Sequence, residues 1–494
     1  ALWPFSTLGW PDKEKTLENF YPNSVLVTGF DIIFFWVARM IMMTKHFMKE
    51  VPFKEVYITG LIKDENGQKM SKSKGNILDP IDLIDGVSLE ELLEKRTEGM
   101  MQPQLKEKII KQTKKQFPEG IESYGTDALR YTFYSLASPG RDINFDIGRI
   151  KGYRNFCNKI WNAFRFIEMQ VGNHDYQPNE TSEDILSDWM GSKIYQTAEN
   201  CQTHIKQYRF DLASAEIYEL IWSNFCDWYI EFSKVAIQKS AETSQINTLI
   251  GNLIDNFYSI LELLHPFMPF ITEELSSKLA DLTKVEKPGF LVECGFAHGR
   301  EPKKKTEQQL DEIIKIISAL RVLRAENQNI KNETLNLIIS NDLNSEMQSV
   351  ICESKEVIAG IAKLDGIEFS DKIPAESIEK TMDGYKLIIP LEGLIDPEEE
   401  MMRLQKELEA QGISACTMNQ LSPEMLECVL LIDDFHLLKN EEVHQLQKQL
   451  HTIVKHGGRI FLITASIKQH SFPSNFFSVV KEWNIPKLKI KEMG

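Results

Sequence analysis

Lysines alternate with small residues in the segment Lys69–Asn76, the lysine segment, which reads Lys-Met-Ser-Lys-Ser-Lys-Gly-Asn. Displacement of pyrophosphate from a nucleoside triphosphate builds negative charge on the β- and γ-phosphates, and catalysis of such a step is mostly electrostatic positioning. Each lysine is a point charge with rotatable donors, so several of them on one mobile loop suit that task. A solvated basic loop without a ligand is the alternative for a bare cluster of lysines.

The residues on either side of the lysine segment predict elements that would hold it in place. Asn66-Gly67, just upstream, is a dipeptide that favours a tight chain reversal. Downstream, Asp79 and Pro80 predict a helix start, with Asp79 as N-cap and Pro80 at the first helical position. A strand, a basic loop and a helix N-terminus in this order form a phosphate-handling arrangement.

The chain upstream of this arrangement predicts a parallel α/β sheet. Val25–Thr28 and Val56–Ile62 are typical of short buried strands, and the apolar face of Phe30–Phe47 predicts a helix between them. Asp31 follows the first strand, where acidic residues of other nucleotide sites accept hydrogen bonds from ribose hydroxyls. A helix N-cap is the other interpretation of Asp31.

From Ser88 onwards the pattern becomes helical. Ser88-Leu-Glu-Glu91 has the spacing of a capping box. Between residues 152 and 281 apolar residues recur at steps of three and four, which predicts a helical bundle with aromatic side chains in its core. The residues on which this prediction depends are Phe156, Ile160, Phe164, Ile167, Trp222, Trp228 and Phe232.

The last part of the chain predicts two further small α/β units. Residues 306–395 combine a helix pattern (310–326) with strand patterns (335–340 and 385–390). Heptad spacing then starts at Met401 and stops at Gly412, far short of a stable coiled coil. Finally, strand patterns at 428–434 and 460–464 flank an amphipathic helix pattern at 443–453, which predicts a β-α-β unit.

Charge and cysteine content limit the class of protein. There are 56 Lys and Arg against 72 Asp and Glu, a net charge of −16, but affinity for phosphate depends on the local density of basic residues. That density is high at residues 69–74, 106–115, 141–165 and 303–305. The seven cysteines form no CxxC pair, which argues for a reducing cytosol and against a disulfide framework or a structural zinc site. The most apolar window, 25–43, contains Asp31 and Arg39, so no membrane span is predicted.

The complete string of the lysine segment resembles the signature loop of class I aminoacyl-tRNA synthetases. The resemblance implies catalytic roles for Lys72, which would contact the ATP phosphates, and for Lys69, which would assist it. Mg²⁺ would accompany the ATP. The implied ATP-binding residues are Lys69, Ser71, Lys72 and Ser73 in the loop, with Gly29 and Asp31 at the adenosine.

Further segments, as far as about Glu409, are similar to the valine-specific members of this family. Examples are Ala1–Pro11, Val27–Met40 and an insertion at Ile81–Pro118. The similarity implies ATP-dependent activation of valine and its transfer to tRNA(Val). It also places Trp36 in the wall of the valine pocket, although a tryptophan on a helix is more often part of a core.

The resemblance leads to a domain plan of class α/β plus α. Residues 1–150 would be the second half of a Rossmann-like catalytic domain, 151–300 a helical anticodon-binding domain, 301–400 a small α/β subdomain and 401–412 the start of a coiled-coil arm. The implied tRNA contacts are Arg149, Arg154, Asn158 and Lys159, for which a solvated helix face is an equal alternative. A cytoplasmic monomer is expected.

Two departures from the family pattern limit this interpretation. The family's other signature, His-Ile-Gly-His, does not occur, and neither does an editing insertion, so a fragment that is inactive alone is expected. A non-catalytic tRNA-binding remnant and an isoleucine-type ligase are the alternatives.

Residues 413–494 depart as well, because Val429–His436 resembles the Walker B strand of DnaA-like AAA+ ATPases and Ile463–Ser466 their sensor strand. Without a phosphate-binding loop, ATP hydrolysis is not expected there. An ordinary strand end remains the alternative, and a fusion, a relic or a sequence-assembly join would each account for the change.

Overall fold

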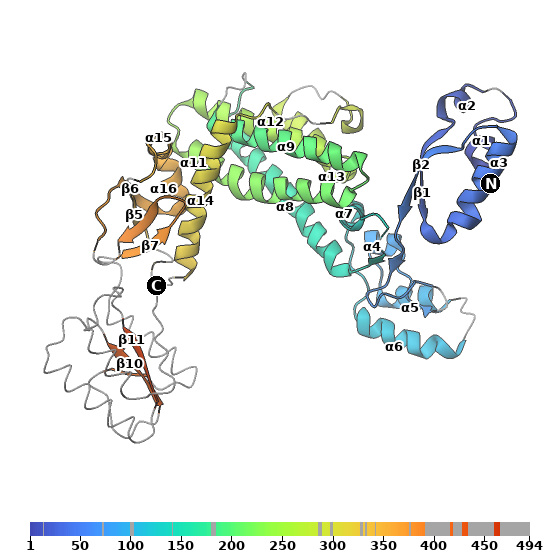
Figure 1. Cartoon of the computed structure of the whole chain (residues 1–494), viewed down its shortest axis with the longest axis horizontal. Helices are drawn as coiled ribbons and strands as arrows, with labels where there is room; N and C mark the ends of the chain where they lie inside the picture. The colour runs from blue at the N-terminus through green and yellow to red at the C-terminus, as the bar shows by residue number, and fades with distance from the viewer. Residues whose placement is uncertain are drawn as a thin grey trace. The chain divides into compact units, whose positions relative to one another are not determined.

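The computed structural model describes two compact units, residues 1–311 and 312–494 (Figure 1). The described residues are 1–12, 14–71, 74–98, 103–140, 142–178, 184–284, 289–296, 300–326, 330, 333–340, 342–374, 377–390, 415–417, 427–432 and 459–464. Within them, no helix has the length and apolar character needed to cross a membrane.

The first unit begins with the strand–helix–strand arrangement that the sequence predicts, but the prediction that its strands are buried is wrong, since Val27 is 58% and Val56 39% exposed. β1 and β2 pair in parallel, with Leu26 opposite Val56, and the helix between them packs Val37 and Met40 against Phe53. The helix starts irregularly, as a 3-10 turn followed by a π-helical turn, before it becomes α-helical. The elements are α1 (Trp3–Ser6), α2 (Lys15–Phe20), β1 (Asn23–Gly29), η1 (Phe30–Ile32), η2 (Ile33–Val37), α3 (Ala38–Phe47) and β2 (Phe53–Thr59).

Short helices and strands precede and follow the lysine segment in the chain. The predicted caps are confirmed: Asp79 accepts a hydrogen bond from Ile81 N, and Ser88 and Glu91 form a capping box. β3 and β4 pair in parallel, and α5 and α6 form a helical hairpin, the α5–α6 hairpin. The bounds are β3 (Ile62–Lys63), α4 (Pro80–Asp85), α5 (Leu89–Thr97), η4 (Pro103–Leu105), α6 (Lys106–Gln116), α7 (Thr126–Leu136) and β4 (Ile143–Asn144).

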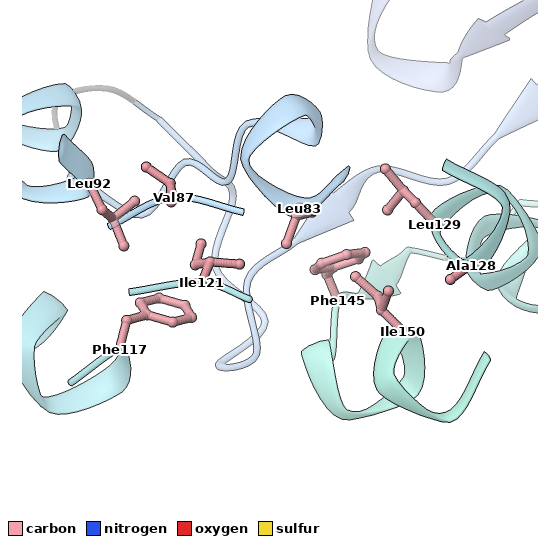
Figure 2. Packing of buried hydrophobic residues seen from close by; sticks show 9 residues of the cluster. All are labelled: Leu83, Val87, Leu92, Phe117, Ile121, Ala128, Leu129, Phe145 and Ile150. Atoms are coloured by element: carbon pink, nitrogen blue, oxygen red, sulfur yellow. The ribbon is translucent and has the colours of Figure 1, made fainter. Parts of the chain in front are cut away.

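One hydrophobic cluster joins these elements, as Figure 2 shows. Its side chains come from α4, α5, α7, α8 (Ile147–Asn173) and the connections between them, and Met70 of the lysine segment packs against it. The base of the α5–α6 hairpin is closed by two backbone hydrogen bonds between Val87 and Ile121. Gly120 is required there, because its φ is +90° and a Cβ would lie 2.2 Å from Val87 O. The cluster consists of Leu83, Val87, Leu92, Phe117, Ile121, Ala128, Leu129, Phe145 and Ile150.

A helical bundle follows, as predicted (Figure 1). The apolar stripe from Phe156 to Ile167 is buried, and Phe232 is too, but Trp222 and Trp228 are only partly buried. The prediction that both tryptophans are core residues is therefore wrong in part. The helices are α8 (Ile147–Asn173), α9 (Ile185–Lys206), α10 (Phe210–Glu219), the π-helical η5 (Leu220–Tyr229), α11 (Ile230–Lys239), α12 (Thr243–Leu264), α13 (Pro269–Thr283) and η6 (Leu291–Glu293).

The second unit contains a four-stranded sheet with the order β6-β5-β8-β7, in which β5 and β6 are parallel. The predicted strands at 335–340 and 385–390 are confirmed, whereas β6 and β7 were not predicted. α14 crosses the boundary between the units. The elements are α14 (Lys304–Glu326), β5 (Leu335–Ile339), α15 (Ser345–Glu353), α16 (Lys355–Ala362), β6 (Leu364–Phe369), β7 (Ser377–Thr381) and β8 (Lys386–Pro390).

A separate parallel sheet has the order β11-β10-β9. Its strands are β9 (Ala415–Thr417), β10 (Glu427–Ile432) and β11 (Arg459–Thr464). The parallel pairing of β10 with β11 agrees with the predicted β-α-β unit. The helix predicted at 443–453 and the heptads at 401–412 lie outside the described residues, and the resemblance to AAA+ ATPases stays a prediction.

Candidate functional site

The lysine segment is held in shape by one asparagine. Asn76 Nδ2 donates to Asp64 Oδ2 at 2.8 Å and, more weakly, to Lys69 O at 3.4 Å, while Asn76 Oδ1 accepts from Ser71 N at 2.9 Å. A single side chain thus joins the turn before the segment to two points within it. Although Asn76 closes the motif, its role was not predicted, because the spacing does not reveal which backbone groups an amide will reach.

The turn before the segment is organised by Asp64. Its Oδ1 accepts hydrogen bonds from Asn66 N at 3.0 Å and Gln68 N at 2.8 Å, and Gly67 adopts a φ of +71°. Partial desolvation acts to raise the pKa of the Asp64 carboxyl, but the hydrogen bonds from Asn76, Gln68 and Asn66 outweigh it and lower the pKa. The tight reversal predicted from Asn66-Gly67 is confirmed.

The other end of the segment rests on α6. Gly75 has a φ of +63°, and a Cβ there would lie 2.6 Å from the side chain of Ile109. The loop therefore needs glycine twice over, for its left-handed backbone and for the close approach of the helix. Through this contact the α5–α6 hairpin directly supports the lysine segment.

The loop reaches the carboxyl end of β1. Lys69 Nζ lies 3.3 Å from Asp31 Oδ2, although 38 residues separate them in the chain. Gly29 leaves room for this carboxylate, since a Cβ on Gly29 would lie 2.8 Å from Asp31 Oδ1. Asp31 lies within η1, whose N-cap is Gly29, so the N-cap interpretation of Asp31 is wrong.

Two of the predicted loop residues, Lys72 and Ser73, lie outside the described residues. Lys69, Ser71, Gly29 and Asp31 are described, and the Lys69–Asp31 ion pair brings the loop and the strand end together. The sequence predicted roles for residues of both segments, and the tertiary structure shows that Lys69 and Asp31 meet.

Aromatic side chains on the helix after β1 are unusually exposed. Phe34 is 76% exposed and Trp36 39% exposed, both within the π-helical turn η2. π-Helical turns occur frequently at functional sites. The interpretation of Trp36 as an ordinary core residue does not fit this exposure.

A cavity of about 470 Å³ lies on the Val27 face of β1, next to α7. None of the predicted site residues lines it. Most of its lining residues are aromatic. Two of them, Tyr57 and Tyr208, stack with ring centroids 5.0 Å apart. The lining residues are Val27, Tyr57, Arg130, Phe133, Tyr134, Ala137, Tyr208 and Phe210.

The four predicted tRNA contacts all lie on α8, but they do not share one face. Arg154 and Asn158 are one turn apart, whereas Arg149 is two and a half turns from Asn158 and points the opposite way. Arg149 and Asn158 are exposed. Arg154 pairs with Glu122 at 3.3 Å.

Lys159 is engaged within the bundle itself. Its ammonium lies 2.7 Å from Asp227 and 4.5 Å from the centre of the Trp222 ring, which stacks on Tyr218. A ligand phosphate would compete with Asp227 for this lysine.

Among the described residues, no group of three or more His, Cys, Asp or Glu side chains could hold a metal ion.

Two family models match the chain. The model described as "tRNA synthetases class I (I, L, M and V)" matches residues 1–146, which include the lysine segment and the end of β1. The model described as "Anticodon-binding domain of tRNA ligase" matches residues 187–339.

Curated relatives agree with these matches. The chain is 47% identical over 412 residues to a valine–tRNA ligase of Francisella tularensis subsp. tularensis, covering 83% of this chain and 44% of that protein. It is 44% identical over 413 residues to a valine–tRNA ligase of Coxiella burnetii, covering 83% and 45%. The chain thus spans less than half the length of either relative.

A solved structure of Mycobacterium tuberculosis methionyl-tRNA synthetase in complex with methionyl-adenylate matches with a TM-score of 0.41 and 17% identity, over 58% of this chain and 54% of that one. The family match over the lysine segment, together with identity above 40% to two relatives over most of the chain, decides its membership. The chain belongs to the class I aminoacyl-tRNA synthetases and is a homologue of the valine–tRNA ligases among them.

Proposed function

We propose that this chain is part of a valine–tRNA ligase, which activates valine with ATP and transfers it to tRNA(Val). The observation that carries the proposal is the 3.3 Å approach of Lys69 to Asp31, which brings the loop proposed to bind phosphate to the strand end proposed to bind ribose. Identity of 47% to a valine-specific relative supports the choice of amino acid.

In this proposal the loop and the strand end bind opposite ends of ATP. Lys69 and Lys72 stabilise the charge that develops on the β- and γ-phosphates as pyrophosphate leaves, with Ser71 and Ser73 as neighbouring donors. Gly29 and Asp31 hold the adenosine. An exposed ion pair is worth about 0–1 kcal/mol, so ATP can displace Lys69 from Asp31 at little cost. Mg²⁺ enters bound to the ATP phosphates.

Trp36 contributes to the valine pocket in this proposal, and its exposure leaves its ring available to a ligand. Shape alone discriminates amino acids that differ by one methylene by about 1–3 kcal/mol. The tRNA contacts are proposed at Arg149, Arg154, Asn158 and Lys159. We also propose that the protein is cytoplasmic and monomeric. Light scattering of the purified chain tests the monomeric state.

The test adds the part of a relative that this chain does not match. The purified chain is mixed with the part of the Francisella relative that it does not match, and valine-dependent exchange of pyrophosphate into ATP is measured. We expect exchange from the mixture, and a loss on the order of 10²–10³ in kcat from Lys69→Ala or Lys72→Ala, as for removal of other transition-state donors. Lys54→Ala, at an exposed lysine of β2, is the matched control.

The alternatives give different results in the same experiment. Exchange that depends on isoleucine and not valine would show an isoleucine-type ligase. Binding of tRNA by the chain without exchange under any combination would favour a non-catalytic RNA-binding protein. The absence of His-Ile-Gly-His from the sequence is the observation that keeps this second candidate in view.

A further inference from the structure

α6 has the highest density of basic residues among the helices of the first unit, and the proposed site does not use its charge. It contains five lysines and one glutamate, a net charge of +4 in an acidic chain. All five are exposed, and in the described part of the chain none of them forms an ion pair. The lysines are Lys106, Lys108, Lys111, Lys114 and Lys115.

Three of these lysines form a row on the outer face of the helix. Lys108, Lys111 and Lys115 follow the i, i+3, i+7 spacing of a single helix face. At 1.5 Å per residue the row extends over about 10 Å. Lys114 lies beside it. A nucleic-acid backbone carries closely spaced negative charges, so it can contact all three lysines of such a row, whereas a single compact anion cannot.

The opposite face of α6 is already occupied. Ile109 and Thr113 are buried, and Thr113 accepts a hydrogen bond from Arg96 of α5 at 3.1 Å. The helix therefore has no free apolar face with which to enter a lipid surface, as an amphipathic membrane helix must. What α6 presents to a partner is positive charge.

The position of α6 indicates which polyanion it meets. Its Ile109 lies against Gly75 of the lysine segment, so α6 lies directly beside the segment that is proposed to bind ATP, with its basic face directed away from that segment. The RNA whose end must reach that site is the tRNA of the proposed reaction. Shape and backbone charge are what a protein reads in an RNA stem, and lysines supply the charge.

We propose that the Lys108–Lys111–Lys115 face of α6 binds the phosphate backbone of a tRNA stem. The inference rests on the proposed function, since it takes tRNA as the partner. It adds a binding surface in the catalytic part of the chain, separate from the residues proposed on α8. Loss of the three lysines removes a phosphate contact surface without changing the lysine segment.

The test measures binding of a tRNA(Val) transcript to the full chain at several salt concentrations. The triple variant Lys108→Gln, Lys111→Gln, Lys115→Gln should bind on the order of tenfold more weakly near 0.1 M salt, with the slope of log K against log salt reduced by about 2 to 3. A control variant removes the same charge from exposed lysines of α2, α3 and β2: Lys15→Gln, Lys45→Gln and Lys54→Gln. It should keep the wild-type slope.

The outcomes separate the inference from the proposed function. If the α6 variant binds with wild-type affinity and slope, the inference is overturned while tRNA binding by the chain stands. An equal loss in the control variant would show a general charge effect and would also overturn it. If the wild-type chain binds no tRNA, both the inference and the tRNA part of the proposed function fail. Circular dichroism of each variant checks that the helices are retained.

Discussion

Asn76 shows at the scale of one residue how the backbone at Lys69 and Ser71 is tied to the preceding turn. Its amide bonds to the Asp64 carboxylate and to two backbone groups of the segment, at Lys69 and Ser71. Of the described lysines of the segment, Lys69 contacts Asp31, and the positive charge of Lys74 helps to lower the pKa of the Asp64 carboxyl. The amide of Asn76 thus ties the backbone at Lys69 and Ser71 to the turn at Asp64.

Replacement of Asn76 by alanine should loosen the segment locally. Each hydrogen bond contributes about 0.5–1.5 kcal/mol, so we expect exchange of the Ser71 amide hydrogen to accelerate on the order of tenfold. Hydrogen–deuterium exchange measured by mass spectrometry or NMR reports this directly. Asn155→Ala, at an exposed position of α8, is the control. Unchanged exchange at residues 69–71 would contradict the role given to Asn76.

The Asp64 carboxyl should titrate below its ordinary pKa of 3.8. Because its folded-state pKa is lowered, its contribution to stability is complete above 3.8 and is lost as the pH falls through the lower folded value. An NMR titration of the carboxyl carbon measures this pKa, and Asn76→Ala should move it back upwards. A midpoint at or above 3.8 in the wild-type protein would show that the hydrogen bonds do not outweigh desolvation.

At the scale of elements, the α5–α6 hairpin depends on a buried arginine. Arg96 is 9% exposed, donates to Thr113 Oγ1 and lies 5.1 Å from the centre of the Phe117 ring. Burial lowers the pKa of its guanidinium. The helix that supports Gly75 is thus held to α5 by a buried polar contact.

Arg96→Ala should destabilise the first unit by about 2–3 kcal/mol, because packing is lost and the Thr113 hydroxyl is left without its partner. The double variant Arg96→Met, Thr113→Val should recover most of that loss, since both partners become apolar together. Thermal unfolding compares the variants. Equal melting temperatures for the single variant and the wild type would contradict the assigned role.

At the scale of the whole molecule, the chain consists of two units with separate cores. In the second unit α14 is attached to the sheet by Arg324, which is 8% exposed. Its guanidinium donates to four backbone carbonyls, a geometry that lysine cannot reproduce. The acceptors are the carbonyl oxygens of Ile330, Glu333, Ala362 and Lys363.

Arg324→Ala should unfold the second unit and leave the first intact, because four backbone carbonyls lose the guanidinium donor, two of them at the buried residues Ile330 and Ala362. Calorimetry of the wild-type chain should show more than one transition, and the variant should lose one of them. Arg324→Lys should not restore it, and Arg321→Ala, at an exposed position of the same helix, should be neutral. Loss of all transitions together in Arg324→Ala would show that the units do not fold separately.

The sequence by itself determined the local features of this protein. The caps at Asp79 and Ser88, the reversal at Asn66-Gly67 and the buried stripe of α8 were all predicted, because each depends on residues within a few positions of one another. The lysine segment was also sufficient to predict the family, because a run of eight residue types is specific.

Only the tertiary structure decided which of these features meet. The approach of Lys69 to Asp31, the support of Gly75 by Ile109 and the tie from Asn76 to Asp64 each join parts of different elements. The distances between these residues depend on how strands and helices pack in the folded protein. The spacing of residues along the sequence does not reveal that packing. For the same reason the helix α8 could be predicted from the sequence, while the contacts of Lys159 with Asp227 and Trp222 of η5 became clear only in three dimensions.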